Sequence, residues 1–129
     1  MPITYERDDD RRRISVTLVG EISVEDLLAI VDRQANEGTW RYGVFYDARR
    51  VTKRVDGTAA EARRVLEHVL TVCATHGARG PVAIVTDRPA DYGIARAYSN
   101  IGIAAKVVVE VFRDPGDAER WLTSVTPAK

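Results

Sequence analysis

The chain has 129 residues, of which 45% are hydrophobic and 29% charged, and its 19 basic residues balance its 19 acidic residues. This size and composition are typical of one compact domain, so we expect residues 1–129 to form a single domain that needs no disulfide or metal. A net charge of zero lacks the basic excess of a dedicated nucleic-acid binder, and nucleic acid is therefore not an expected partner.

Cysteine content and hydropathy indicate in which cellular compartment the protein is expected. Cys73 is the single cysteine, which excludes a disulfide within the chain and suits a reducing environment. No stretch reaches the roughly 18 apolar residues that a membrane-spanning helix needs. Residues 1–10 also lack the basic and apolar segments of a signal peptide. We therefore expect a soluble cytoplasmic protein with no integral membrane segment.

The chain opens with two predicted strands. Residues 2–7 and 12–20 alternate apolar and polar side chains, and the segment DDDRRR between them predicts a solvated hairpin turn. Ser23 is the predicted N-cap of a helix that Gly38 ends. The nearly continuous apolar run of residues 42–48 then predicts a strand covered on both faces.

A long amphipathic helix is predicted after that strand. Thr58 and Glu61 have the spacing of a capping box, and Gly77 is placed to end the helix. We expect one apolar face to be buried, formed by Ala62, Val65, Leu66, Val69, Leu70 and Cys73. On this basis Thr58 is predicted to be a cap rather than a switch, and Cys73 a core thiol rather than a nucleophile.

The C-terminal part continues the alternation of strands and helices. Residues 81–87 and 106–112 predict two strands, and Pro89 fits the first turn of a helix between them. Asp114 is the predicted cap of a last helix, with Pro115 in its first turn. Its predicted inward side chains are Trp121, Leu122 and Val125. The apolar last strand also leads us to expect a homodimer formed through an exposed sheet edge.

This order of elements predicts an α/β fold. We expect one mixed sheet of about five strands, an N-terminal antiparallel hairpin followed by parallel strands, with four helices packed on it. In such sheets ligands and partners meet the carboxyl ends of the parallel strands, where loops adjoin helix N-termini. Residues 47–58 and 86–92 are the predicted loops at that end.

Basic residues gather in these two predicted loops and, at Arg96, on the helix predicted after the second loop. The predicted ligand- or partner-binding residues are Asp47, Arg49, Arg50, Arg88, Tyr92 and Arg96. Arginine recognises oxyanions through two parallel hydrogen bonds, so we predict a shallow site for a carboxylate, a phosphate or an acidic partner surface. The alternative is that they are ordinary surface arginines paired with local acids. No metal or other cofactor is expected, because His68, His76 and Cys73 lack ligand spacing.

Three segments carry a family resemblance: GVFYDARRV, GPVAIVTDRPADYGIARAYSNIG and VEVFRDPGDAERWL. Over about residues 3–124 the chain resembles the SpoIIAA-like group of small α/β proteins, relatives of the STAS domains of anti-sigma-factor antagonists and similar in fold to CRAL-TRIO lipid-transfer domains. The resemblance implies a regulatory interaction module. Antagonist STAS domains carry a phosphorylatable serine after an aspartate at this strand end. Here Asp47 matches the aspartate, but Ala48 stands at the serine position.

Three classes of function are compatible with these patterns. The sequence favours a non-enzymatic interaction or regulatory module that lacks the phosphorylatable serine. The alternative is a binder of a lipid or small anionic ligand in a pocket like that of CRAL-TRIO domains. An enzyme is the least favoured class, because no nucleophile and base occur at a recognisable spacing. An apolar tunnel would favour the lipid, whereas a filled interior with an exposed apolar patch would favour a protein partner.

Overall fold

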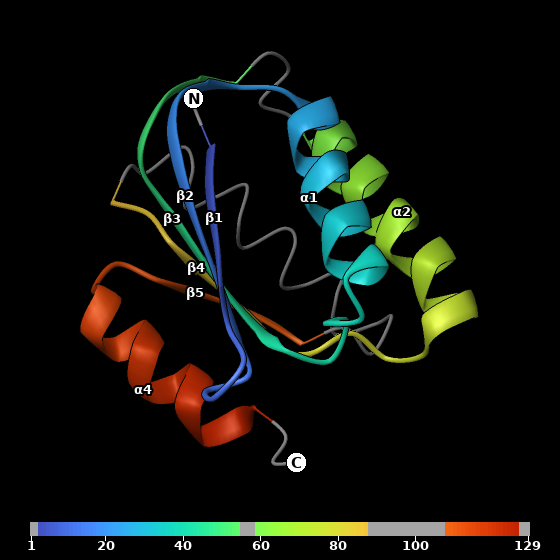
Figure 1. The fold of residues 1–129 in the computed structure, drawn as a ribbon. Coiled ribbons are helices and arrows are strands. Elements are labelled where there is room, and N and C mark those ends of the chain that lie inside the picture. Colours follow the sequence, from blue (N-terminus) through green and yellow to red (C-terminus); the bar gives the residue numbers. More distant parts are fainter. Residues whose placement is uncertain (1–2, 55–58, 88–107, 127–129) are drawn as a thin grey trace.

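The computed structural model of the chain describes residues 3–54, 59–87 and 108–126. Within them, one sheet has the strand order β1-β2-β3-β4-β5 (Figure 1). The strands are β1 (Ile3–Asp8), β2 (Arg13–Ile22), β3 (Gly43–Arg54), β4 (Val82–Val85) and β5 (Val109–Phe112). The helices are α1 (Val24–Asn36), α2 (Ala59–His76) and α4 (Pro115–Val125).

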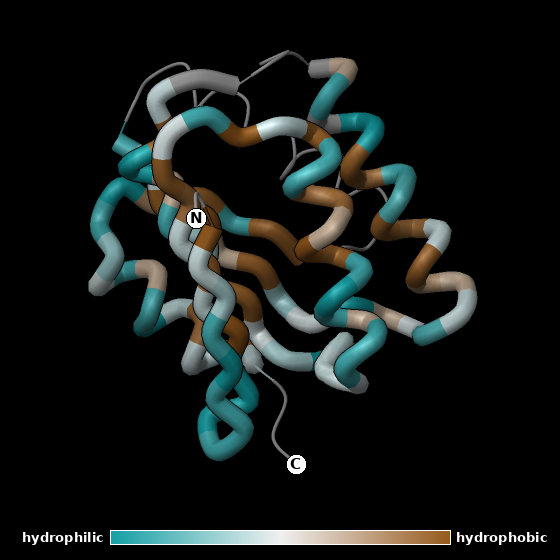
Figure 2. Tube along the Cα trace, turned by 45° about the horizontal axis from the view of Figure 1, so that its top comes forward, coloured by the Kyte–Doolittle hydropathy of each residue, from teal (hydrophilic) through white to brown (hydrophobic). Residues whose placement is uncertain are grey.

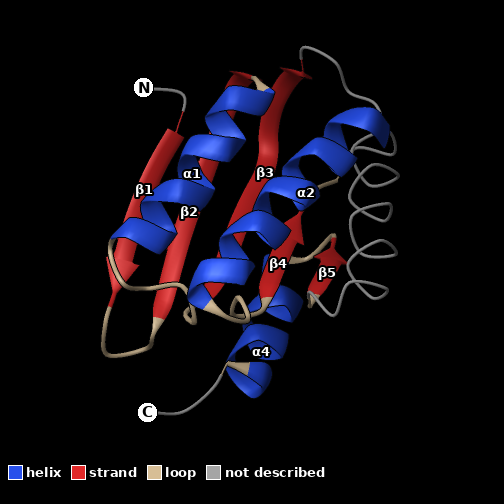
Figure 3. Ribbon diagram, turned by 90° about the vertical axis from the view of Figure 1, so that its right-hand side faces the viewer, coloured by secondary structure: helices blue, strands red, loops and turns tan. Residues whose placement is uncertain are grey.

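The strand directions confirm the predicted mixed sheet. β1 and β2 are antiparallel, and every other neighbouring pair is parallel. Right-handed connections that advance in one direction put their helices on one face, and α1 and α2 do cover the same face (Figure 3). α4 follows β5 and covers the opposite face, so the sheet lies between two helical layers. Three helices are described, and the helix predicted from Pro89 lies outside the described residues.

The larger core lies between the sheet and the layer of α1 and α2, and we call it the helix-face core. Ile14, Val16 and Leu18 are at most 2% exposed there, as the alternation in the sequence predicted. Val44 of β3 and Val65 of α2 belong to the same buried cluster. Figure 2 shows hydrophobic residues gathered in the interior and hydrophilic residues at the tip of the β1–β2 hairpin.

A smaller outer core lies between the sheet and α4. Ala83 and Val85 of β4 meet Ala118 and Leu122 of α4, and all four are completely buried. The rings of Phe112 and Trp121 lie beside them, with centroids 5.6 Å apart. The doubly covered strand predicted around β4 is therefore confirmed, since β4 is buried on both faces.

Two apolar side chains that were predicted to be inward are exposed instead. Leu70 and Val125 are each 39% exposed. A helix turns about 100° per residue, so Leu70 lies at the edge of the buried face, about 100° from its neighbour Val69, which is 2% exposed. Val125 lies in the last turn of α4, three residues beyond the buried Leu122.

The caps that could be tested are confirmed. Ser23 Oγ accepts from the backbone N–H of Asp26 at 3.1 Å, and the Asp26 carboxylate accepts from the Ser23 N–H at 3.0 Å, which completes a capping box. Gly38 has a φ of +74° just after α1, a conformation that favours glycine. At α4, Asp114 accepts from the N–H of Gly116 at 2.9 Å. α1 and α4 therefore begin where their local sequences specify.

The length of β3 is the largest departure from prediction. The sequence predicted a strand over 42–48 and a basic loop over 47–58, but β3 continues to Arg54. β2 extends to Ile22 and supplies backbone partners for most of residues 47–54. The loop prediction was therefore wrong for residues 47–54, because inter-strand hydrogen bonding outweighs the polar character of the segment. Thr58, the predicted cap of α2, lies outside the described residues.

The last two strands are shorter than predicted. β4 covers Val82–Val85 rather than 81–87, and β5 begins at Val109 rather than within 106–108. The pairing sets these limits, because Val82 aligns with Val109 and Val85 aligns with Phe112. β5 is the terminal strand of the described sheet, as expected for an edge.

Candidate functional site

Asp47 and Arg49 form a two-pronged ion pair in the middle of β3, where Asp47 pairs with Val85 at the carboxyl end of β4. Arg49 Nε and Nη2 donate to Asp47 Oδ1 and Oδ2 at 2.9 and 2.8 Å, and the Arg49 backbone N–H donates to Oδ1 at 3.1 Å. Hydrogen bonding from the Arg49 side chain is the main reason that the pKa of Asp47 lies below its usual value. The two side chains are 18% and 40% exposed, so the pair is accessible while its geometry is fixed.

A β-bulge leaves Arg49 and Arg50 exposed next to each other. The parallel register between β2 and β3 shifts by one residue at this point. Ala48 and Val51, on either side of the two arginines, both belong to the helix-face core. In a regular strand, residues three apart point to opposite faces, and the extra residue removes that alternation. Both guanidinium groups consequently lie on the side away from the helix-face core.

Carboxylates from the neighbouring strands lie near Arg49. After Asp47 itself, Asp87 beyond β4 and Asp114 at the start of α4 contribute to a raised pKa of Arg49. We use the name carboxyl-end surface for the set Val19, Asp47, Arg49, Arg50, Asp87 and Asp114. Val19 pairs with Arg50 and is 39% exposed. Mixed charge around one apolar side chain resembles the polar rim of an interface more than its apolar centre.

The structure describes half of the predicted binding residues. Asp47, Arg49 and Arg50 lie together on β3, whereas Arg88, Tyr92 and Arg96 lie outside the described residues. Because Asp47 already accepts two side-chain hydrogen bonds from Arg49, a bound anion would compete with it. The predicted anion site at this end of the sheet stays a prediction.

A second polar cluster lies near the amino ends of β3 and β4, and no sequence pattern pointed to it. Arg79 Nε donates to Gln34 Oε1 at 2.9 Å, and Arg79 Nη2 donates to the Tyr46 hydroxyl at 3.3 Å. The Arg79 guanidinium also lies 5.2 Å from the ring centroid of Trp40. Gln34 is 1% exposed and donates its amide to the carbonyl oxygens of Thr39 and Trp40 at 3.1 and 3.3 Å. These residues come from four separate segments, so only packing reveals the cluster.

A small cavity adjoins this cluster within the helix-face core. Its volume is about 70 Å³, and its wall combines the polar groups of Arg79 and Tyr46 with apolar side chains that include Leu18, Val65 and Val82. One water molecule needs about 10–15 Å³, so the cavity has room for about five water-sized groups. Among the described residues, it is too small to be the tunnel that an acyl lipid would need.

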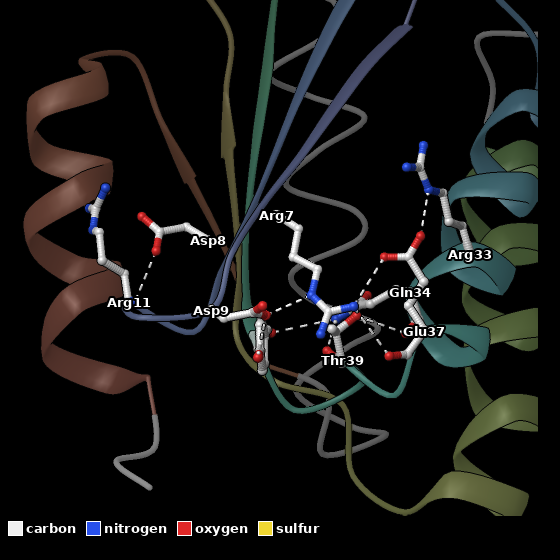
Figure 4. A network of polar contacts seen from close by, with 9 residues as sticks. Arg7, Asp8, Asp9, Arg11, Arg33, Gln34, Glu37 and Thr39 are labelled. Carbon is white, nitrogen blue, oxygen red and sulfur yellow. Dashed lines mark hydrogen bonds and ion pairs between the residues drawn. The ribbon is translucent and has the colours of Figure 1, made fainter.

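A network of exposed polar groups connects the β1–β2 hairpin to the end of α1 (Figure 4). Asp9 Oδ1 accepts from Arg7 Nε at 2.6 Å and from the Tyr42 hydroxyl at 2.7 Å. Arg7 also lies 3.7 Å from the carboxylate of Glu37, which Arg33 binds at 2.8 Å. We assign this network to positioning the hairpin, because its charged groups already pair with one another.

The same hairpin also contacts α4. The Arg13 side chain, 2% exposed, donates to Glu119 at 2.6 Å, and Arg11 donates to the same carboxylate oxygen at 2.8 Å. Burial alone would raise the pKa of Glu119, but the two arginines outweigh burial and the pKa lies below its usual value. The turn that was predicted to be only a solvated connection therefore also helps to hold α4.

Cys73 and His68, which the sequence analysis weighed as chemical groups, both contact neighbouring parts of the fold. Cys73 packs, half-buried, against the core formed by α1 and α2, and a His68 ring nitrogen lies 2.7 Å from Asp32 of α1. In residues 3–54, 59–87 and 108–126, no group of three or more histidines, cysteines or carboxylates could hold a metal ion. No helix in these ranges has the length and apolar character to cross a membrane.

Neither a protein-family model nor a curated protein matches the chain. Solved structures do resemble it. An uncharacterised protein of the DUF3478 family from Shewanella loihica PV-4, which has a SpoIIAA-like fold, is 18% identical with a TM-score of 0.56, over 93% of this chain and 91% of the other.

Two structures of SpoIIAA resemble the chain to a similar degree. The anti-sigma factor antagonist SpoIIAA in its unphosphorylated form is 13% identical with a TM-score of 0.54, over 92% of this chain and 96% of the other. The Bacillus cell fate determinant SpoIIAA in its phosphorylated form is 13% identical with a TM-score of 0.52, over 92% and 98%. The chain therefore has a SpoIIAA-like α/β fold, which confirms the resemblance predicted from the sequence.

Proposed function

We propose that this protein is a non-enzymatic interaction module that binds a protein partner through the carboxyl-end surface. The observation that carries the proposal is the bulge in β3, which presents Arg49 and Arg50 side by side. Asp47 fixes Arg49 before any partner arrives. A side chain that is already ordered loses less conformational entropy on binding, so this arrangement favours recognition.

The fold gives independent support for an interaction role. SpoIIAA, which shares the fold, is an anti-sigma factor antagonist. In this chain Ala48 stands where the resemblance places the phosphorylatable serine, and it is 1% exposed in the helix-face core. We therefore propose an interaction that is not controlled by phosphorylation at this position.

The charges of the surface define the partner chemistry. Arg50 would pair with an acidic group of the partner, and Asp87 and Asp114, both exposed, would pair with basic groups. Such contacts are screened by salt over about 8 Å at physiological ionic strength. We expect binding to weaken as the salt concentration rises.

A homodimer and a cytoplasmic location remain parts of this proposal. β5 is the terminal strand of the described sheet, and the adjacent Val108 is 52% exposed. An exposed strand edge beside an apolar side chain supports pairing with a second copy. Contact through β5 would leave Arg49 and Arg50 accessible, because they lie on β3.

The test combines photo-crosslinking with charge reversal. A photoreactive amino acid replaces Val19, and crosslinked products are compared in cells expressing the parent, Arg50→Glu or Arg63→Glu. Arg63 is exposed on α2, in the helical layer on the opposite face, so its reversal is the matched control. We expect one dominant product that falls at least about tenfold with Arg50→Glu, since a reversed charge replaces an attraction by a repulsion. A product that persists in Arg50→Glu, or falls equally in both variants, would contradict the proposal.

A further inference from the structure

Arg79 is a half-buried guanidinium whose hydrogen bonds go to neutral groups. Within the described part of the chain, its acceptors are the Gln34 amide oxygen and the Tyr46 hydroxyl, and no carboxylate lies within ion-pair distance. Trp40 shields one side of the guanidinium. A partly buried charge of this kind is stabilised further when an oxyanion binds to it.

The Tyr46 hydroxyl adds a donor to the same place. It accepts the hydrogen bond from Arg79, and in the described ranges it donates to no acceptor. Both groups belong to the wall of the 70 Å³ cavity, whose other lining side chains are apolar. The cavity therefore offers a charged donor and a neutral donor at one part of a hydrocarbon-lined space.

Arg79 also lines a groove on the outside of the molecule. This groove, of about 330 Å³, lies at the amino ends of the strands and includes Arg41, Gly80, Val108 and Val125. Arg79 therefore belongs to the walls of both the cavity and the groove.

We propose that this cavity binds a short-chain monocarboxylate. The carboxylate accepts hydrogen bonds from Arg79 and Tyr46, and the alkyl chain lies against Leu18, Val65 and Val82. A volume of 70 Å³ corresponds to about five water-sized positions, which matches a chain of about four or five carbons and excludes a membrane lipid. The site lies on the helix side of the sheet, so it stands or fails independently of the partner proposed for the carboxyl-end surface.

The first experiment measures chain-length selectivity. Sodium salts of the straight-chain acids from acetate to octanoate are titrated into the protein, and binding is followed by NMR of the leucine and valine methyl groups. We expect the tightest binding for butanoate or pentanoate, with a Kd of about 1 mM, and weaker binding of octanoate. Absence of any shift at the cavity methyls with butanoate at tens of millimolar would overturn the proposal.

The second experiment separates the charge from the cavity. Arg79→Gln should weaken butanoate binding about tenfold and leave the weaker binding of neutral 1-butanol unchanged, because only the acid uses the guanidinium. Arg41→Gln is the matched control, since Arg41 lines the outer groove without reaching the cavity, and it should bind butanoate as the parent does. Equal butanoate affinity in Arg79→Gln and the parent would overturn the assignment.

A further pair of variants keeps the test decisive if Arg79→Gln does not fold. Tyr46→Phe removes one hydroxyl from the wall and should weaken butanoate about threefold while retaining 1-butanol. Ala48→Leu places a larger side chain in the cavity and should abolish binding of both compounds. Butanoate binding that is unaffected by either change would place the acid elsewhere and refute the proposal.

Discussion

The two faces of the sheet hold their helices by different means. On the face covered by α1 and α2, contact is a large apolar core in which Ile14 and Val44 are completely buried. On the other face, α4 rests on a small apolar cluster around Leu122, and the ion pair between Glu119 and Arg13 supplements it. The face covered by α1 and α2 therefore carries most of the hydrophobic stabilisation. The face covered by α4 has a smaller apolar contact and exposed charged groups.

This division leaves Asp47 and Arg49 of the carboxyl-end surface with little part in holding the fold together. Asp47 and Arg49 are at the surface, and their pairing contributes little to the free energy of unfolding because exposed ion pairs are weak. The residues can therefore change with little loss of stability. We expect the variants below to separate the two faces, from the largest effect to the smallest.

Leu122→Ala tests whether the small outer core alone docks α4. Leu122 is completely buried, so removing three carbons should lower the free energy of unfolding by about 3 kcal/mol, measured by urea denaturation. Val125→Ala on the same helix is the control; its side chain is 39% exposed, and a change below about 0.5 kcal/mol is expected. Similar losses in the two variants would show that the outer core does not depend on Leu122.

Glu119→Gln tests the ionic part of the attachment. The substitution leaves the Arg13 guanidinium, 2% exposed, without its carboxylate, and should cost about 1–2 kcal/mol. This is less than the loss of a fully buried pair because Glu119 is 40% exposed. Asp117→Asn is the control, since Asp117 pairs with Arg120 on the exposed side of α4 and should change stability by less than about 0.5 kcal/mol.

The pH dependence of this pair has a definite sign. Because the folded pKa of Glu119 is depressed, its contribution is complete above the unfolded value of about 4.3 and is lost as the pH falls through the folded pKa. The stability advantage of the parent over Glu119→Gln should thus shrink as the pH is lowered below about 4. An advantage that grows in acid would contradict the assignment.

Asp47→Ala should have the smallest effect on stability. Arg49 is 40% exposed, so loss of the pair should change the free energy of unfolding by about 0.5 kcal/mol or less. NMR relaxation of the Arg49 Nε–H should show increased side-chain motion, because its two acceptors are gone. A loss above about 1 kcal/mol would show that the pair stabilises the fold. It would contradict the assignment of little structural role to Asp47 and Arg49.

Much of the fold could be predicted because its signals are local. Alternation identified β1 and β2, and the capping residues Ser23 and Asp114 marked two helix starts. The extension of β3 to Arg54 could not be predicted, because it depends on backbone pairing with the distant β2. The exposure of Val125 likewise depends on what packs against α4 and not on the helix pattern itself.

The carboxyl-end surface and the Arg79 cavity also differ in whether their residues are close together in the sequence. Asp47, Arg49 and Arg50 are almost consecutive, so a charge pattern after an apolar strand was enough to select them. Their pairing and the bulge were not visible in the sequence. Arg79 and Gln34 are 45 positions apart and come together only when α1 packs on the sheet, so no spacing rule could have selected them.

The strand order described above has a consequence for how the protein is made. Each described strand after β1 pairs with the strand that precedes it along the chain. During synthesis, β2 can pair with β1 and then β3 with β2, and no strand has to wait for a partner that the ribosome has not yet produced. A growing sheet of this kind exposes one open edge at a time. The nascent chain consequently offers few unpaired strands to its neighbours on a crowded polysome.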